Sequence, residues 1–165
     1  MVLPKKMEEA INKQINAELY SAYLYLSMAA YFESTNLSGF AKWMEVQAQE
    51  EKQHAMKLYH YVIERGGRVI LDAIQKPQSE WKSPLDVFEA VYAHEKHVTE
   101  LIYNLMDVAK SEKDYATEVM LHWFIKEQVE EEANASSILE RIKMVKDSVN
   151  GILQYDKILG KRGTE

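Results

Sequence analysis

The sequence predicts an all-α fold: a four-helix bundle with one long crossover connection and a short fifth helix after it. Glycine and proline are sparse, with 6 and 3 copies in 165 residues, and the long segments between them carry apolar residues at helical spacing. Two helix pairs are each joined by a short polar turn, whereas about 18 residues without a helical stripe join the pairs. Short turns produce antiparallel neighbours, and a long crossover makes the second and third helices parallel.

The first predicted helix covers about residues 5–33, where apolar positions recur at helical spacing: Ile11, Ile15, Ala22, Leu26 and Ala29. A polar turn follows, and Ser38 is expected to cap the next helix. This second helix covers about residues 39–65 and ends at a glycine pair. One of its faces carries Phe40, Met44, Gln47, Glu51, His54, Leu58 and Tyr61.

The segment after the glycine pair contains a proline and would span roughly 60 Å if fully extended. A long helix of this bundle spans about 40 Å, so the segment can run its whole length. Ser83 and Pro84 predict the start of a third helix over about residues 84–111. Asp114 is placed to cap a fourth helix over about residues 114–146, and a short fifth helix is predicted at 148–159. Residues 1–165 are thus expected to form a single domain.

Composition excludes several classes of function. The chain has 26 acidic and 20 basic residues, a net charge of −6, which disfavours nucleic acid and anionic lipid as partners. The absence of cysteine excludes disulfides, thiolate zinc sites and iron–sulfur clusters. The N-terminal segment turns charged before any apolar stretch develops, and no segment approaches the ~20 apolar residues of a membrane span. A cytoplasmic location without membrane contact is expected.

Each long helix carries one glutamate on its apolar stripe: Glu18, Glu51, Glu95 and Glu131. Residues three and four apart share a helix face, so each carboxylate points where its apolar neighbours point. All four lie within about two residues of the middle of their helices. Mid-helix positions come to one level of a bundle whatever the helix direction, so the four carboxylates are expected to meet in the core.

Buried carboxylates without partners are very costly, and no Lys or Arg lies on these stripes at that level. A single Glu on a stripe is more often solvated at its edge, and a lone His is more often an ordinary hydrogen-bonded residue. The coincidence of four glutamates at one depth, with His54 three residues after Glu51, instead favours two divalent cations. Oxygen-rich ligation with one imidazole suits Fe or Mn better than structural Zn.

Four segments resemble the helix motifs of the non-haem bacterial and archaeal ferritins: NAELYSAYLYL, QAQEEKQHA, AHEKHVT and WFIKEQVEEEA, in helix order. The resemblance covers nearly the whole chain. It implies a ferroxidase that oxidises Fe(II) with O2 or hydrogen peroxide and stores ferric oxyhydroxide inside a 24-subunit cage of identical chains.

The resemblance also assigns residues. Glu18, Glu51 and His54 match the ligands of the first iron, and Glu51 would bridge to a second iron held by Glu95 and Glu131. Gln128 matches a glutamine beside the centre, and Tyr25 matches a neighbouring tyrosine. Glu50, Glu127 and Glu130 match a third iron site. Two alternatives stay open. The third-site glutamates could be a solvated acidic cluster, and the tyrosine could be a core aromatic without a redox role.

Differences between this sequence and the motifs of related families restrict the cofactors and functions that we expect. Bacterioferritins carry a second Glu-x-x-His where this chain has Asn134, and a haem-ligating Met where it has Lys52, so no haem is expected. Rubrerythrins need a cysteine-rich iron domain, which this chain lacks. Two other functions remain as alternatives: a di-metal carboxylate oxidase or peroxidase acting on a small substrate without mineral storage, and a non-catalytic bundle with acids in its core.

Overall fold

The computed structural model describes residues 1–164 and contains five helices. They are α1 (Lys5–Ser34), α2 (Ser38–Glu64), α3 (Pro84–Ser111), α4 (Tyr115–Val145) and α5 (Val149–Leu159), and residues 1–164 contain no strand. The predicted all-α bundle is confirmed, and every helix boundary falls within one residue of the predicted one. None of the helices in this part of the chain combines the length and apolar character needed to cross a membrane.

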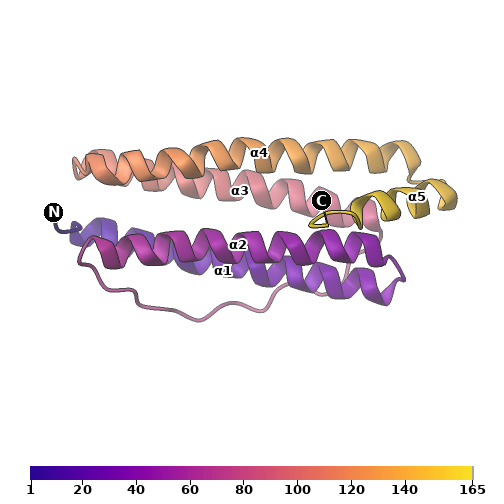
Figure 1. Cartoon of the computed structure of the whole chain (residues 1–165), viewed down its shortest axis with the longest axis horizontal. Coiled ribbons are helices and arrows are strands. Elements are labelled where there is room, and N and C mark those ends of the chain that lie inside the picture. Colours follow the sequence, from indigo (N-terminus) through magenta and orange to yellow (C-terminus); the bar gives the residue numbers. More distant parts are fainter. Residues whose placement is uncertain (165) are drawn as a thin grey trace.

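The four long helices form two antiparallel pairs, α1 with α2 and α3 with α4, and α5 packs against α2 and α4 at one end (Figure 1). The crossover between α2 and α3 runs the length of the bundle, as its extended length predicts (Figure 1). Polar side chains of α1 hold it in place. Asn12 Nδ2 donates to Arg68 O at 3.0 Å, and Ser27 Oγ donates to Gln78 O at 2.7 Å. The crossover is therefore fixed by hydrogen bonds as well as by its ends.

The first turn of α2 is capped by another helix. Ser38 was expected to provide the cap, but it lies inside the helix and its side chain makes no cap hydrogen bond. Instead, the amide of Phe40 donates to Oδ1 of Asp156 from α5, at 2.9 Å. Gly39 permits this approach, because a Cβ there would lie 1.7 Å from the carbonyl oxygen of Asp156. The prediction was wrong because a distant side chain supplies the acceptor that the local hydroxyl was expected to supply.

The starts of α3 and α4 have the local caps that the sequence predicts. Ser83 Oγ accepts from the amide of Asp86 at 3.1 Å, with Pro84 at the first helical position. Asp114 Oδ1 accepts from the amide of Thr117 at 3.3 Å at the start of α4. Both caps satisfy amides that have no partner within the helix.

The core consists of two apolar clusters, one toward each end of the bundle. On α1, one cluster includes Met7, Ile11 and Ile15, and the other begins at Leu24. The same division recurs on α2, α3 and α4, and the polar mid-helix residues lie between the clusters. The predicted stripe of α1 was partly wrong, because Leu26 is 52% exposed. The apolar clusters thus enclose a polar layer at the middle of the bundle.

Candidate metal centre

The polar layer contains the four mid-helix glutamates. They come from α1, α2, α3 and α4 and are almost fully buried: Glu18 at 1% exposure, Glu51 at 2%, Glu95 at 1% and Glu131 at 6%. His54, one turn after Glu51, is 5% exposed. Four antiparallel and parallel helices of similar length thus bring their centres to one level, as the sequence indicates.

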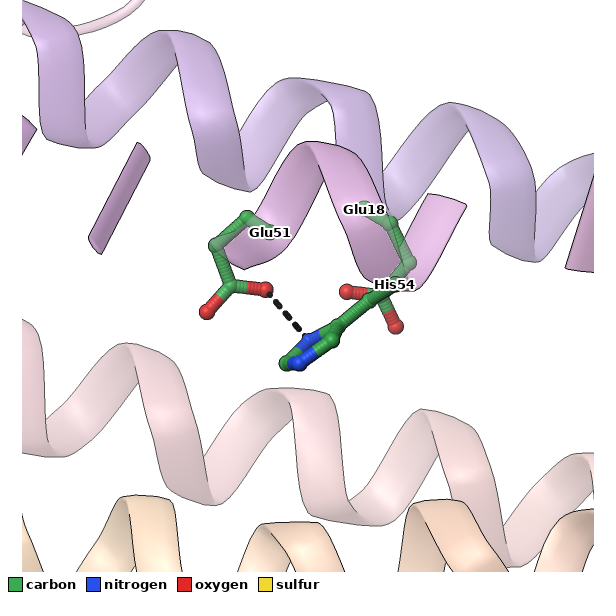
Figure 2. Close-up of side chains that lie close together, drawn as sticks. All are labelled: Glu18, Glu51 and His54. Carbon is green, nitrogen blue, oxygen red and sulfur yellow. Dashed lines mark hydrogen bonds and ion pairs between the residues drawn. The ribbon is translucent and has the colours of Figure 1, made fainter. Parts of the chain in front are cut away.

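Among themselves, the four carboxylates and His54 form two overlapping sets of donors. One set consists of Glu18, Glu51 and His54, and the other consists of Glu51, Glu95 and Glu131. Within each set, one ligand atom from each residue lies within 4.8 Å of the others. Figure 2 shows the first set, with Glu18 from α1 and the other two side chains from α2. His54 Nδ1 lies 3.2 Å from Glu51 Oε2. Glu51 belongs to both sets, so a single carboxylate joins the two groups of donors.

One buried oxygen in the layer has no hydrogen-bond partner. Gln14 Nε2 donates to Glu18 Oε1 at 2.9 Å, but Glu18 Oε2 has no partner among the described residues. An unsatisfied buried carboxylate oxygen costs free energy, and a cation would remove that cost. In residues 1–164, His54 supplies the only ion-pairing nitrogen within 4.0 Å of these four carboxylates. The donor set therefore fits a divalent cation that accepts both carboxylate oxygen and imidazole ligands.

Burial raises the pKa of every carboxyl in the layer, because the charged form loses its hydration. Burial and the charge of Glu51 raise the pKa of Glu18 to about 8. Burial and the charge of Glu95 raise the pKa of Glu131 to about 7. Burial also raises the pKa of Glu51 well above its usual value and raises that of Glu95. Without metal, the layer therefore retains protons near neutral pH.

Two further candidates contact Glu95. The hydroxyl of Tyr25 donates to Glu95 Oε1, and Gln128 Nε2 donates to Glu95 Oε2 at 3.2 Å. Burial, followed by the charge of Glu95, raises the pKa of Tyr25 well above its usual value, so the phenol stays a donor. The structure thus places both residues beside the second donor set, with their polar groups hydrogen-bonded.

The three predicted third-site residues differ in their surroundings. Glu127 lies close to the centre, with Oε1 3.7 Å from His54 Nε2, and forms a third donor set with His54 and Glu131. Glu50 instead pairs with Arg162 at 2.8 Å. Glu130 is exposed and belongs to none of the donor sets found in residues 1–164. A third cation at these glutamates remains a prediction, and one oxygen of Glu50, Oε2, already pairs with Arg162.

The structure adds polar contacts that sequence reasoning did not assign. Gln47 Nε2 donates to Glu51 Oε1 and to Glu131 Oε2, both at 2.9 Å. Gln14 and Gln47 each precede a glutamate of the centre by four residues, and this shared spacing is a signal that could have identified them.

Comparison with known proteins agrees with this architecture. Residues 8–145 match the family model for the ferritin-like domain. A bacterial non-heme ferritin of Bacteroides fragilis is 47% identical over 161 residues, covering 98% of this chain and 100% of that protein. A bacterial non-heme ferritin of Staphylococcus epidermidis is 39% identical over 161 residues, covering 98% of this chain and 97% of that protein.

Solved structures give the same result. An open-pore ferritin from the hyperthermophilic archaeon Archaeoglobus fulgidus is 54% identical, with a TM-score of 0.96 over 97% of this chain and 98% of that one. An engineered closed form of the Archaeoglobus fulgidus ferritin matches with the same TM-score and identity. Family model, sequence relatives and structures all cover nearly the whole bundle, and the chain belongs to the ferritin family.

Proposed function

We propose that this ferritin oxidises Fe(II) at the mid-bundle centre and stores the product as ferric oxyhydroxide inside a cage of 24 identical chains. The observation that supports this most directly is the sharing of Glu51 between two buried donor sets. A shared carboxylate holds two cations close enough to give up one electron each to the same oxidant.

The overall reaction balances with two electrons. Two Fe(II) ions each lose one electron, and these electrons with two protons reduce O2 to hydrogen peroxide, or hydrogen peroxide to two water molecules. Four carboxylates neutralise the charge of two Fe(II) ions, but oxidation leaves an excess of two positive charges. This excess favours hydrolysis of the ferric ions and their departure from the buried site toward the mineral.

Carboxyl groups of the centre bind protons in the metal-free protein and release them when iron binds. Glu18 and Glu131, with pKa values of about 8 and 7, hold protons near neutral pH in the metal-free protein. Cations bind the deprotonated forms, so binding releases these protons and its affinity rises with pH. Tyr25 and Gln128 hold the Glu95 carboxylate through hydrogen bonds while cations enter and leave.

Stopped-flow Fe(II) oxidation tests the proposed centre. Replacing both Glu51 and His54 by alanine removes the shared carboxylate and the only imidazole in the first donor set. We expect the initial oxidation rate to fall at least tenfold. Losing even a residue that only orients the metal ligands typically lowers metal affinity or activity by about that much. The exposed Glu45, changed to Gln, is the matched control on the same helix. Oxidation by the double variant at the wild-type rate would contradict the assignment.

Size-exclusion chromatography with light scattering and iron analysis tests the storage role. A cage of 24 copies of the 19.2 kDa chain has a mass of about 460 kDa. We expect that mass, and several irons beyond the centre retained per chain after aerobic loading. A monomer or dimer that oxidises Fe(II) without retaining mineral would instead support a di-metal oxidase acting on a small substrate.

A further inference from the structure

The chain continues past α5 into a short tail that folds back onto α2. The guanidinium of Arg162 in this tail lies over the ring of Trp43, with its central carbon 4.3 Å from the ring centroid. Its NH1 group donates to the carbonyl oxygen of Trp43 at 3.3 Å. The Arg162 side chain is only 20% exposed. A partly buried, stacked arginine of this kind has a defined position rather than a free range of rotamers.

The same guanidinium reaches the metal centre through one amide. Its NH2 group donates to Gln47 Oε1 at 2.9 Å and to Glu50 Oε2 at 2.8 Å. Gln47 then donates both hydrogens of its amino group, one to Glu51 and one to Glu131, each at 2.9 Å. If the amide of Gln47 were flipped, its oxygen would face two carboxylates, which only accept hydrogen bonds. Its amino group would face a guanidinium, which only donates them. Arg162 therefore fixes which end of Gln47 faces the centre.

Both carboxylates held by Gln47 belong to the second donor set. Glu51 is shared between the two sets, and Glu131 completes the second with Glu95. A partner that orients metal-binding side chains changes metal affinity although it does not touch the metal. The contact also joins residues far apart in the chain, since Gln47 and Arg162 are 115 positions apart.

We propose that Arg162 is a positioning residue of the metal centre, acting through Gln47 on Glu51 and Glu131. This inference rests on the proposed function, because it assumes that cations occupy the second donor set. It assigns the C-terminal tail a role at the centre of the bundle, in addition to packing at its end.

Anaerobic titration with Co(II) tests the proposal without any redox reaction. The full-length Arg162→Gln variant removes the donors to Gln47, and Lys161→Gln is a matched control that removes the neighbouring exposed charge. We expect Arg162→Gln to bind one of two Co(II) ions about tenfold more weakly, with altered visible d–d bands. Lys161→Gln should match wild type. Arg162→Lys keeps the positive charge without the planar fork, and it should recover part of the affinity.

Double variants separate the two routes from Arg162. If the effect passes through Gln47, adding Arg162→Gln to Gln47→Ala changes Co(II) affinity no further, because coupled residues are not additive. If it passes through Glu50 instead, it disappears in a Glu50→Gln background, and the proposal is overturned. Unchanged mass and melting temperature of Arg162→Gln and Arg162→Lys exclude a folding effect.

The outcomes also separate this inference from the proposed function. Wild-type protein that binds two Co(II) ions per chain, together with an unaltered Arg162→Gln titration, overturns the role of Arg162 and leaves the ferroxidase proposal standing. Wild-type protein with no saturable Co(II) binding overturns both.

Discussion

The hydroxyl of Tyr25 on α1 donates a hydrogen bond to the carboxylate of Glu95 on α3, across the centre of the bundle. Both side chains are at most 1% exposed. The bond joins two helices that belong to different antiparallel pairs, and it ends on a carboxylate of the second donor set. The centre is thus held between the pairs by hydrogen bonds as well as by the cations it would bind.

Replacing Tyr25 by Phe should destabilise the metal-free protein. The variant leaves a buried oxygen of Glu95 without its donor, a change that costs about 1–3 kcal/mol per chain. A cation in the second donor set would compensate the charge of the Glu95 carboxylate, so the difference from wild type should shrink when Zn(II) is present. Thermal unfolding at one scan rate, with and without Zn(II), measures this. The exposed Tyr103, changed to Phe, is the control. An equal loss of stability with and without Zn(II) would contradict the prediction.

The metal-free protein should lose stability as pH rises through the neutral range. The pKa of Glu18 is about 8 in the folded chain against 4.5 for the unfolded group. The folded state therefore binds more protons between these values, and its stability falls as pH increases. For Glu18 the loss is on the order of 5 kcal/mol per chain over the whole interval.

Chemical denaturation of chelator-treated protein between about pH 5 and pH 8.5 checks this dependence. Glu18→Gln should flatten the decline, because the amide does not titrate, while the exposed Glu45→Gln should leave it unchanged. A decline of equal slope in Glu18→Gln would show that the other three carboxyls, and not Glu18, carry the proton linkage.

His94 should make the stability of the folded chain fall as pH decreases, which is the opposite of the effect of Glu18. Burial, followed by the charge of His97, lowers the pKa of His94 from 6.5 to about 4. Its Nε2 lies 2.8 Å from Ser21 Oγ on α1. The unfolded state takes up the proton first, so stability is lost as pH falls from about 6.5 toward 4. The loss is on the order of 2 kcal/mol per chain, allowing for partial exposure.

His94→Gln should retain its stability better than wild type over that acid interval, and the exposed His122→Gln should behave like wild type. The measurement is again the denaturation midpoint against pH. Parallel curves for His94→Gln and wild type would mean that His94 is protonated without penalty in the folded state.

Asp156 should stabilise the start of α2 from a distance. Asp156→Ala removes the acceptor for the amide of Phe40 and should cost about 1 kcal/mol per chain. Asp156→Asn keeps an acceptor oxygen and should lose only part of that. Hydrogen exchange at the amide of Phe40 reports the effect locally, and the melting temperature reports it globally. Unchanged exchange in Asp156→Ala would assign the cap to another group.

The features that local sequence patterns could not predict are those that depend on contacts between helices. Helix limits follow from spacing and from caps that lie next to the helix, such as Ser83 and Asp114, and these predictions succeeded. The prediction of Ser38 as the cap was wrong because Asp156, far along the chain, accepts the hydrogen bond from the first turn of α2. The exposure of Leu26 could not be inferred either, since only packing decides where an apolar stripe ends.

The sequence by itself determined the helical bundle, its crossover and the meeting of four glutamates at one level, because helical periodicity and mid-helix position fix both face and depth. Only the tertiary structure decided how the crossover is held to α1, which oxygen of Glu18 lacks a partner, and how Arg162 reaches the centre through Gln47. These features depend on contacts between residues distant in the chain. No local spacing specifies such contacts, because they arise from how complete helices pack.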